Sequence, residues 1–207
     1  MKFFITGIST DVGKTIASSI ITEGLEADYW KPVQAGDLDC SDSHKVAAYI
    51  SNKKTVIYPN SYALQTPASP HYAAKIDGIT IDLKNIKEPQ TSNHLIIEGA
   101  GGLYVPLNEE SYVIDLIQED YKVIIVSRHY LGSINHTFLT IQALQNKNIA
   151  IAGIIFSGDE NKGTESVILK NTGVHYLGRI EQEPYFDKNV VAAYADIFRN
   201  IFLDLSI

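Results

Sequence analysis

The chain has 207 residues, 45% of them hydrophobic, which suits one domain over residues 1–207 with its own apolar core. Its net charge of −7, without any run of Lys or Arg, argues against nucleic acid or an anionic membrane as a partner. The single cysteine excludes an internal disulfide, and no apolar stretch approaches the roughly 20 residues that span a bilayer. We therefore expect a cytoplasmic protein.

Short apolar runs alternate along the chain with longer segments of helical period, which is typical of an α/β fold. The runs predicted as strands are 2–6, 28–31, 94–98, 122–127, 149–156 and 174–178. The segments predicted as helices are 13–23, 41–51, 113–118, 133–146, 161–171 and 189–204. Prolines interrupt the segment 56–90, where only a short helix over 69–75 is predicted. Several strands are apolar on both faces, so we predict a mostly parallel sheet flanked by helices.

The first predicted strand leads into the loop GISTDVGKT (7–15), which opens an apolar-periodic helix. Backbone N–H groups of such a loop and the helix N-terminus attract phosphate oxygens. Lys14 is placed to reach terminal phosphates, and the Thr15 hydroxyl to bind Mg²⁺. Five residues, not the usual four, separate the two glycines. The alternative is a plain glycine turn with a solvated Lys14, but the preceding strand and the Lys-Thr pair favour a nucleotide site.

A second chemical region is LIIEGAGG (95–102), an apolar run that ends in Glu98 and continues into glycines. Ligands of open parallel sheets bind at the carboxyl ends of the strands, where Glu98 would lie beside the loop 7–15. Glu98 is therefore predicted to complete a Mg²⁺ shell. The alternative is an acidic residue at the sheet edge followed by a flexible turn.

A third region follows the predicted strand 28–31, which ends in Lys31 and precedes Asp37, Asp39 and Asp42. Lys31 is poised to contact phosphate or an anionic intermediate, although a lone lysine is more often solvated. One aspartate is predicted to supply a second carboxylate for Mg²⁺, and Asp42 is the candidate.

These regions, in this order, resemble the dethiobiotin synthetase family. The family patterns GTDTxVGKT, KPVxxG and EGAGG are similar to residues 7–15, 31–36 and 98–102. The patterns PxSPH and LGxINH are similar to residues 67–71 and 131–136, so the resemblance covers most of the chain. It implies a P-loop NTPase fold, ATP and Mg²⁺ as cofactors, and 7,8-diaminononanoate and carbon dioxide as substrates. It also implies a homodimer with the substrate site near the interface.

The resemblance implies a role for each matching residue. Implied as catalytic are Lys31, Lys14 and Thr10, and as Mg²⁺ ligands Thr15, Asp42 and Glu98. Implied around the nucleotide and its metal are Asp11, Val12, Gly13, Lys14, Thr15, Ile16, Asp42, Glu98 and Ser157. Implied around the diamine are Thr10, Ala35, Gly101, Gly102, Leu103 and Asn135.

The sequence departs from the family pattern at a few of these places. Ser9 stands where Asp is usual, Ala35 where a hydroxyl residue often holds substrate, and Ser157 where Asn reads the adenine edge. The segment 178–181 reads Gly-Arg-Ile-Glu in place of Gly-x-Ile-Pro. A serine offers a shorter and less discriminating partner than asparagine, so the nucleotide preference stays open.

Three alternatives stay open beside the synthetase. An amidating ligase of cobyrinic-acid type needs a glutaminase domain, for which 207 residues leave no room. A partitioning ATPase switch normally has an extra lysine early in its phosphate loop, and residues 8–12 contain none. A nucleotide-binding module without catalysis would need neither Lys31 nor Glu98.

Overall fold

The computed structural model describes residues 1–205, whose centre is a seven-stranded sheet. The strand order is β4-β2-β6-β1-β7-β8-β9, and every neighbouring pair is parallel. The strands are β1 (Lys2–Gly7), β2 (Asp28–Trp30), β4 (Ile57–Tyr58), β6 (Leu95–Glu98), β7 (Tyr121–Arg128), β8 (Ile151–Ser157) and β9 (Tyr176–Ile180). The predicted parallel sheet is confirmed.

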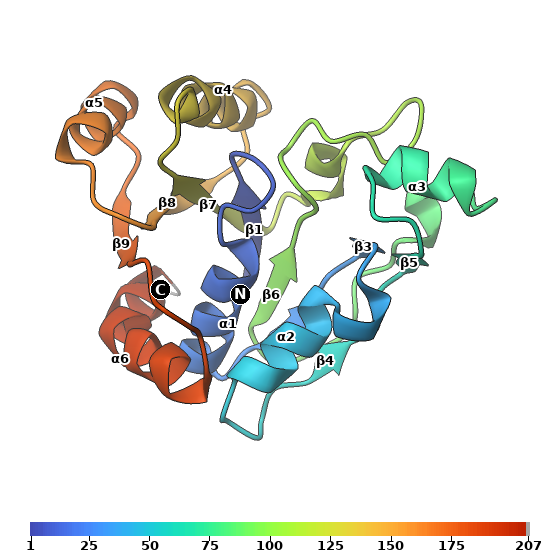
Figure 1. Cartoon of the computed structure of the whole chain (residues 1–207), viewed down its shortest axis with the longest axis horizontal. Coiled ribbons are helices and arrows are strands. Elements are labelled where there is room, and N and C mark those ends of the chain that lie inside the picture. Colours follow the sequence, from blue (N-terminus) through green and yellow to red (C-terminus); the bar gives the residue numbers. More distant parts are fainter. Residues whose placement is uncertain (206–207) are drawn as a thin grey trace.

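Helices cover both faces of the sheet, as expected for parallel strands (Figure 1). On one side α1 (Lys14–Leu25) packs against α6 (Lys188–Leu205) and α2 (Asp42–Tyr49). On the other side α4 (Ser133–Asn146) packs against α5 (Lys162–Thr172). The α/β prediction with flanking helices is therefore confirmed.

The core lies between these layers and follows the sequence pattern. Phe3, Phe4 and Ile5 of β1 are all fully buried, because a central strand has helices or loops on both faces. In α6 the buried residues Val191, Ala195, Phe198 and Phe202 recur every three or four positions, so they form one apolar stripe. That stripe packs α6 against α1, and α6 also contacts β9.

A two-stranded parallel sheet, β3 (Val33–Ala35) with β5 (Tyr62–Leu64), lies outside the main sheet. Neither strand was predicted, nor was β4, because two or three residues are too few for a period-2 pattern. The short helix predicted over 69–75 is present as α3 (Pro70–Ile76), with Pro70 at its first position. These elements place the segment 33–37 over the carboxyl edge of the main sheet.

Other boundaries differ from prediction. The helix predicted over 113–118 is wrong: Val113–Leu116 forms one turn of 3-10 helix, and Ile117 is extended. A segment of six residues forms too few backbone hydrogen bonds to offset the conformational entropy lost in nucleating an α-helix. The strand predicted over 174–178 begins two residues later, and β2 ends one residue before Lys31. Within residues 1–205 no helix has the length and apolarity needed to cross a bilayer.

Candidate active site

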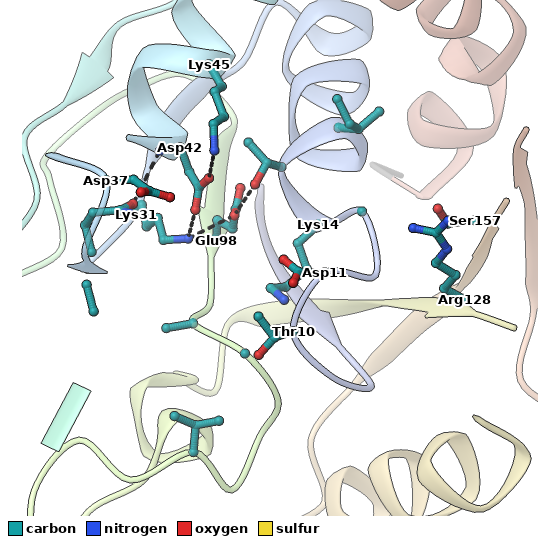
Figure 2. Close-up of a pocket in the computed structure, with 18 of the residues that line it drawn as sticks. Thr10, Asp11, Lys14, Lys31, Asp37, Asp42, Lys45, Glu98, Arg128 and Ser157 are labelled. Atoms are coloured by element: carbon teal, nitrogen blue, oxygen red, sulfur yellow. Dashed lines mark hydrogen bonds and ion pairs between the residues drawn. The ribbon is translucent and has the colours of Figure 1, made fainter. Parts of the chain in front are cut away.

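A cavity of about 770 Å³ opens at the carboxyl edge of the sheet (Figure 2). Its floor is the loop after β1, and residues from the ends of the neighbouring strands line its walls. Glu98 closes β6, Arg128 closes β7 and Ser157 closes β8. This edge is where open α/β sheets bind ligands, and the loop 7–15 lies at its centre.

The loop 7–15 forms a cradle that larger residues would fill. Gly13 has φ 95°, and a Cβ on it would lie 2.8 Å from the Ser157 hydroxyl oxygen. Lys14 is the first residue of α1, and its Nζ donates to the Ser9 carbonyl at 3.0 Å, which holds the side chain over the loop. A concave backbone at a helix N-terminus, with a lysine over it, fits a polyphosphate.

Burial lowers the pKa of Lys14 to about 8, although the nearby Glu98 carboxylate opposes the shift. An anion placed in the cradle would favour the charged ammonium and reverse this effect. Lys14 is therefore suited to a polyanionic ligand.

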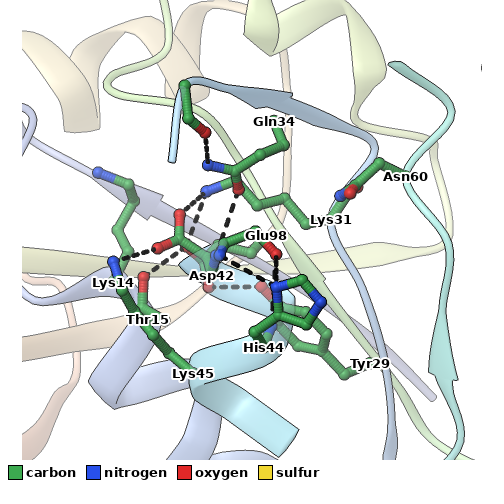
Figure 3. Close-up of polar contacts among 12 residues, drawn as sticks. Lys14, Thr15, Tyr29, Lys31, Gln34, Asp42, His44, Lys45, Asn60 and Glu98 are labelled. Atoms are coloured by element: carbon green, nitrogen blue, oxygen red, sulfur yellow. Dashed lines mark hydrogen bonds and ion pairs between the residues drawn. The ribbon is translucent and has the colours of Figure 1, made fainter. Parts of the chain in front are cut away.

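Next to the cradle, one lysine and two acids from distant parts of the chain meet (Figure 3). Lys31 Nζ contacts Glu98 Oε1 at 3.1 Å and also forms an ion pair with Asp42 Oδ2. Glu98 accepts further hydrogen bonds from Thr15 Oγ1 at 2.9 Å and from the Tyr29 hydroxyl at 3.0 Å. The Lys31 side chain is only 5% exposed and that of Glu98 is 0% exposed. This arrangement compensates one buried carboxylate, Glu98, and one partly buried carboxylate, Asp42.

The charges of this cluster support one another. Burial alone would lower the pKa of Lys31, but Glu98 and Asp42 overcome it and raise that pKa above its usual value. Burial likewise works against the charge of Asp42, yet Lys31 holds the Asp42 pKa below its usual value. Asp42 is also the first residue of α2, where the helix dipole favours a negative charge. The lysine and the aspartate are therefore both ionised at neutral pH.

The oxygens of this cluster suit Mg²⁺. Within residues 1–205 no group of three or more His, Cys, Asp or Glu side chains is arranged to hold a metal by itself. Thr15, Asp42 and Glu98 instead offer hard oxygen donors beside the phosphate cradle. Mg²⁺ takes few protein ligands and completes its shell with phosphate oxygens and water, so this donor set fits it.

The cavity brings together most of the predicted residues, drawn from loops and strand ends. Val12 is buried in the core and Leu103 is 3% exposed, so neither lines the cavity. Gly102 lies beside the loop, where a Cβ would be 3.5 Å from the Gly7 carbonyl oxygen, and Asn135 is exposed on the first turn of α4. The predicted residues that do line the cavity are Thr10, Asp11, Gly13, Lys14, Thr15, Ile16, Lys31, Ala35, Asp42, Glu98, Gly101 and Ser157.

Sequence reasoning missed several lining residues. Lys45 contacts Asp42 Oδ1 at 3.4 Å, and its spacing of three residues from Asp42 in a predicted helix was the available signal. At the other end of the cavity, Arg128 donates to Gln182 Oε1 at 2.9 Å beside Ser157. No motif marks Arg128 or Gln182, because β7 and the segment after β9 meet only in the folded chain.

An ionic cluster joins the strand ends next to this second end of the cavity. Arg179 donates to the Gly158 carbonyl at 3.2 Å and pairs with Glu165, which also contacts His129 Nε2 at 2.8 Å. Burial works against the charge of Glu165, but the bond from Arg179 holds the Glu165 pKa below its usual value. The cluster ties the ends of β7, β8 and β9 together around the cavity.

Comparison with known proteins identifies the family. A family model described as an AAA domain matches residues 1–190. The protein named ATP-dependent dethiobiotin synthetase BioD of Christiangramia forsetii is 59% identical over 198 residues, which are 96% of each chain. The chain belongs to the dethiobiotin synthetase family. The family member of the same name from Cytophaga hutchinsonii is 51% identical, over 94% of this chain and 95% of its own.

Solved structures agree on the fold of this dethiobiotin synthetase family member. The septum site-determining protein MinD of Pyrococcus horikoshii, complexed with Mg-ADP, matches with a TM-score of 0.61 over 100% of this chain and 95% of its own. A putative plasmid partition protein of Borrelia burgdorferi bound to AMPPNP matches with a TM-score of 0.59 over 98% of each chain. Their identities of 16% and 14% show a shared fold alone, and the predicted P-loop NTPase type is confirmed.

Proposed function

We propose that the chain closes a ureido ring on 7,8-diaminononanoate with carbon dioxide, at the expense of ATP and with Mg²⁺, to give dethiobiotin, ADP and phosphate. The observation that carries the proposal is the buried Lys31 between Glu98 and Asp42, beside the phosphate cradle. A pure binding module would gain nothing from burying such a cluster. The 59% identity to a protein named ATP-dependent dethiobiotin synthetase supplies the reaction.

The chemistry asks for positioning and charge neutralisation, without an enzyme nucleophile. One amine of the diamine attacks carbon dioxide and loses a proton, giving a carbamate. A carbamate oxygen then attacks the γ-phosphorus of ATP and ADP leaves, giving a carbamic-phosphoric anhydride. The second amine attacks the carbonyl carbon, and release of phosphate and a proton closes the ring. Each step builds or moves negative charge that nearby cations stabilise.

Three residues of the chain supply this stabilisation in our proposal. Lys31 neutralises the carbamate and the transferring phosphoryl group, and its raised pKa keeps it a cation and not a base. Lys14 neutralises the phosphates in the cradle, and Thr10 lines the cavity close to the site of transfer. Fixed cations of this kind cost no reorganisation during the reaction.

Thr15, Asp42 and Glu98 would hold the Mg²⁺ ion, whose charge would neutralise the β- and γ-phosphate oxygens. The oxygens of Thr15, Asp42 and Glu98 lie close to one another, since Thr15 donates to Glu98 Oε1 and Lys31 contacts both carboxylates. Their convergence supports the assignment.

Other residues are assigned to the two substrates by position. For the nucleotide we assign the loop residues and one strand end, which are Asp11, Val12, Gly13, Ile16 and Ser157. For the diamine we assign Ala35, Gly101, Gly102, Leu103 and Asn135. The first two of these line the cavity next to Thr10 or the acidic cluster, which supports their place in the diamine site.

We also propose that the working enzyme is a homodimer with the diamine site near its interface. Asn135 lies outside the cavity wall, next to apolar side chains that stand in solvent. Leu131 is fully exposed and Leu139 is 54% exposed, and each lies four residues from Asn135 along the chain. A second copy would bury them. Sedimentation equilibrium should give twice the chain mass for the native protein and a lower mass for Leu131→Glu.

Product analysis tests the reaction itself. The pure protein is mixed with 7,8-diaminononanoate, bicarbonate, Mg²⁺ and ATP, and each component is omitted in turn before mass spectrometry. Dethiobiotin in the complete mixture alone supports the proposal. ATP hydrolysis that is indifferent to the diamine would instead indicate an ATPase switch.

A further inference from the structure

Ammonium groups engage both oxygens of the Asp42 carboxylate. Lys31 Nζ contacts Oδ2, and Lys45 Nζ lies 3.4 Å from Oδ1 (Figure 3). A divalent cation that uses Asp42 would therefore come close to at least one of these ammonium groups and be repelled by it.

Lys45 belongs to the cavity and is not an incidental surface residue. It follows Asp42 by three residues on α2, and Tyr49 follows one turn later, so the three side chains share a helix face. All three line the cavity. Figure 2 shows the ammonium groups of Lys45 and Lys31 approaching Asp42 from different sides. Lys45 therefore lines the same cavity as the phosphate cradle.

The two lysines differ in how firmly they are held. The Lys31 side chain is 5% exposed and touches two carboxylates, and its backbone carbonyl accepts from Asn60 Nδ2 at 2.7 Å. The Lys45 side chain is 37% exposed and has one longer contact. A divalent cation that binds Asp42 would displace Lys45 at a lower free-energy cost than Lys31, because a half-exposed ion pair contributes little stabilisation.

We propose that Lys45 is a positioning residue. Its ammonium group forms an ion pair with Asp42 before a metal binds and competes with the divalent cation for that carboxylate. The inference rests on the proposed metal role of Asp42 and Glu98. With a metal bound at Asp42, the Lys45 ammonium would leave the carboxylate and be free to contact a phosphate oxygen of a nucleotide in the same cavity. The site keeps its two carboxylates compensated before the metal arrives and gains a free cation afterwards.

The test measures Mn²⁺ binding to the nucleotide-free protein, by the loss of the electron paramagnetic resonance signal of free Mn²⁺. Lys45→Met keeps the length of the side chain and removes its charge. The matched control is Lys54→Met, which also removes a charge from a lysine paired with a carboxylate, Glu26, but lies outside the cavity. Lys45→Arg keeps the charge, and circular dichroism checks that each variant is folded.

We expect Lys45→Met to bind Mn²⁺ about fivefold more tightly than the wild type, the factor that one exposed ion pair is worth. Lys54→Met and Lys45→Arg should stay within about twofold of the wild type. The Mg²⁺ concentration needed for half-maximal turnover should fall in Lys45→Met as well. If Lys45→Met does not fold, Lys45→Gln must give the same tightening.

Unchanged or weaker Mn²⁺ binding in Lys45→Met would overturn the competition. Equal tightening in Lys54→Met would also overturn it, by showing a general effect of net charge. If neither the wild type nor Lys45→Met binds Mn²⁺, this inference is overturned, whereas the metal assignment, which includes phosphate oxygens, is tested by the Mg²⁺ dependence of turnover. Dethiobiotin formation, measured separately, tells that outcome from a failure of the proposed reaction.

Discussion

Lys31→Met removes the cation that compensates two carboxylates. The Lys31 side chain is 5% exposed and contacts both Glu98, which is fully buried, and Asp42. Removing one partner of a buried ion pair costs about 3 to 5 kcal/mol, since the other charge stays behind uncompensated. Hydroxyl groups still donate to Glu98, so the free energy of unfolding should fall by about 3 kcal/mol, at the lower end of that range.

Urea denaturation followed by circular dichroism at pH 7 in EDTA measures this loss. Adding Glu98→Gln to Lys31→Met should restore part of the stability, because it removes one of the two uncompensated charges. Lys54→Met is the control: its pair with Glu26 is 71% and 43% exposed, so its loss should be below about 1 kcal/mol.

Turnover should fall at least about 100-fold in Lys31→Met, because a fixed cation at the transferring group is lost. Dethiobiotin formation is measured under conditions in which the variant is folded. Wild-type stability in EDTA would refute the compensating role of Lys31, and wild-type turnover would refute its catalytic role.

Lys14→Ala should lower the initial rate about 100-fold or more while the fold persists, since it removes the cation over the phosphates; normal activity would refute its role. Gly13→Ala should weaken binding of a fluorescent ATP analogue about tenfold or more, because the new Cβ would crowd Ser157 and φ is 95°. In Gly78→Ala, where φ is 67° and no atom lies within 4 Å, only stability should fall, by about 1 kcal/mol, with affinity unchanged. The bond from Arg179 holds the Glu165 pKa below its ordinary 4.5, although burial works against the charge. The ionised Glu165 therefore stabilises the fold fully above pH 4.5, and this stabilisation is lost as the pH falls through the folded pKa. Urea midpoints of Glu165→Gln should therefore differ from those of the wild type less in acid than at pH 7.

The parts of the fold that repeat a pattern were predictable from sequence. The central strands are continuous apolar runs and the long helices have apolar stripes, because both are set by burial against neighbouring layers. The strands β3, β4 and β5 were not predictable, since each has two or three residues and depends on partners elsewhere in the chain. The wrong helix at 113–118 shows the same limit, because six residues with some helical period formed only one 3-10 turn.

The site divides in a similar way. Lys14, Thr15, Lys31 and Glu98 were found because each stands at the end of a strand or in a glycine loop, where topology brings ligands. The choice of Asp42 among three aspartates agrees with its contact to Lys31, and its metal role stays a proposal. The pairings that complete the cavity wall, such as Arg128 with Gln182, join segments 54 residues apart and leave no local pattern.

Transfer of a phosphoryl group from ATP to a carbamate of the bound diamine is the central claim, and an oxygen label follows it directly. Freshly dissolved ¹⁸O-labelled bicarbonate is supplied with 7,8-diaminononanoate, Mg²⁺ and ATP, and the released phosphate is analysed by mass spectrometry after short reaction times. Attack by a carbamate oxygen predicts one ¹⁸O in the phosphate formed with each dethiobiotin. Phosphate that carries no label, formed in step with dethiobiotin, would contradict the account.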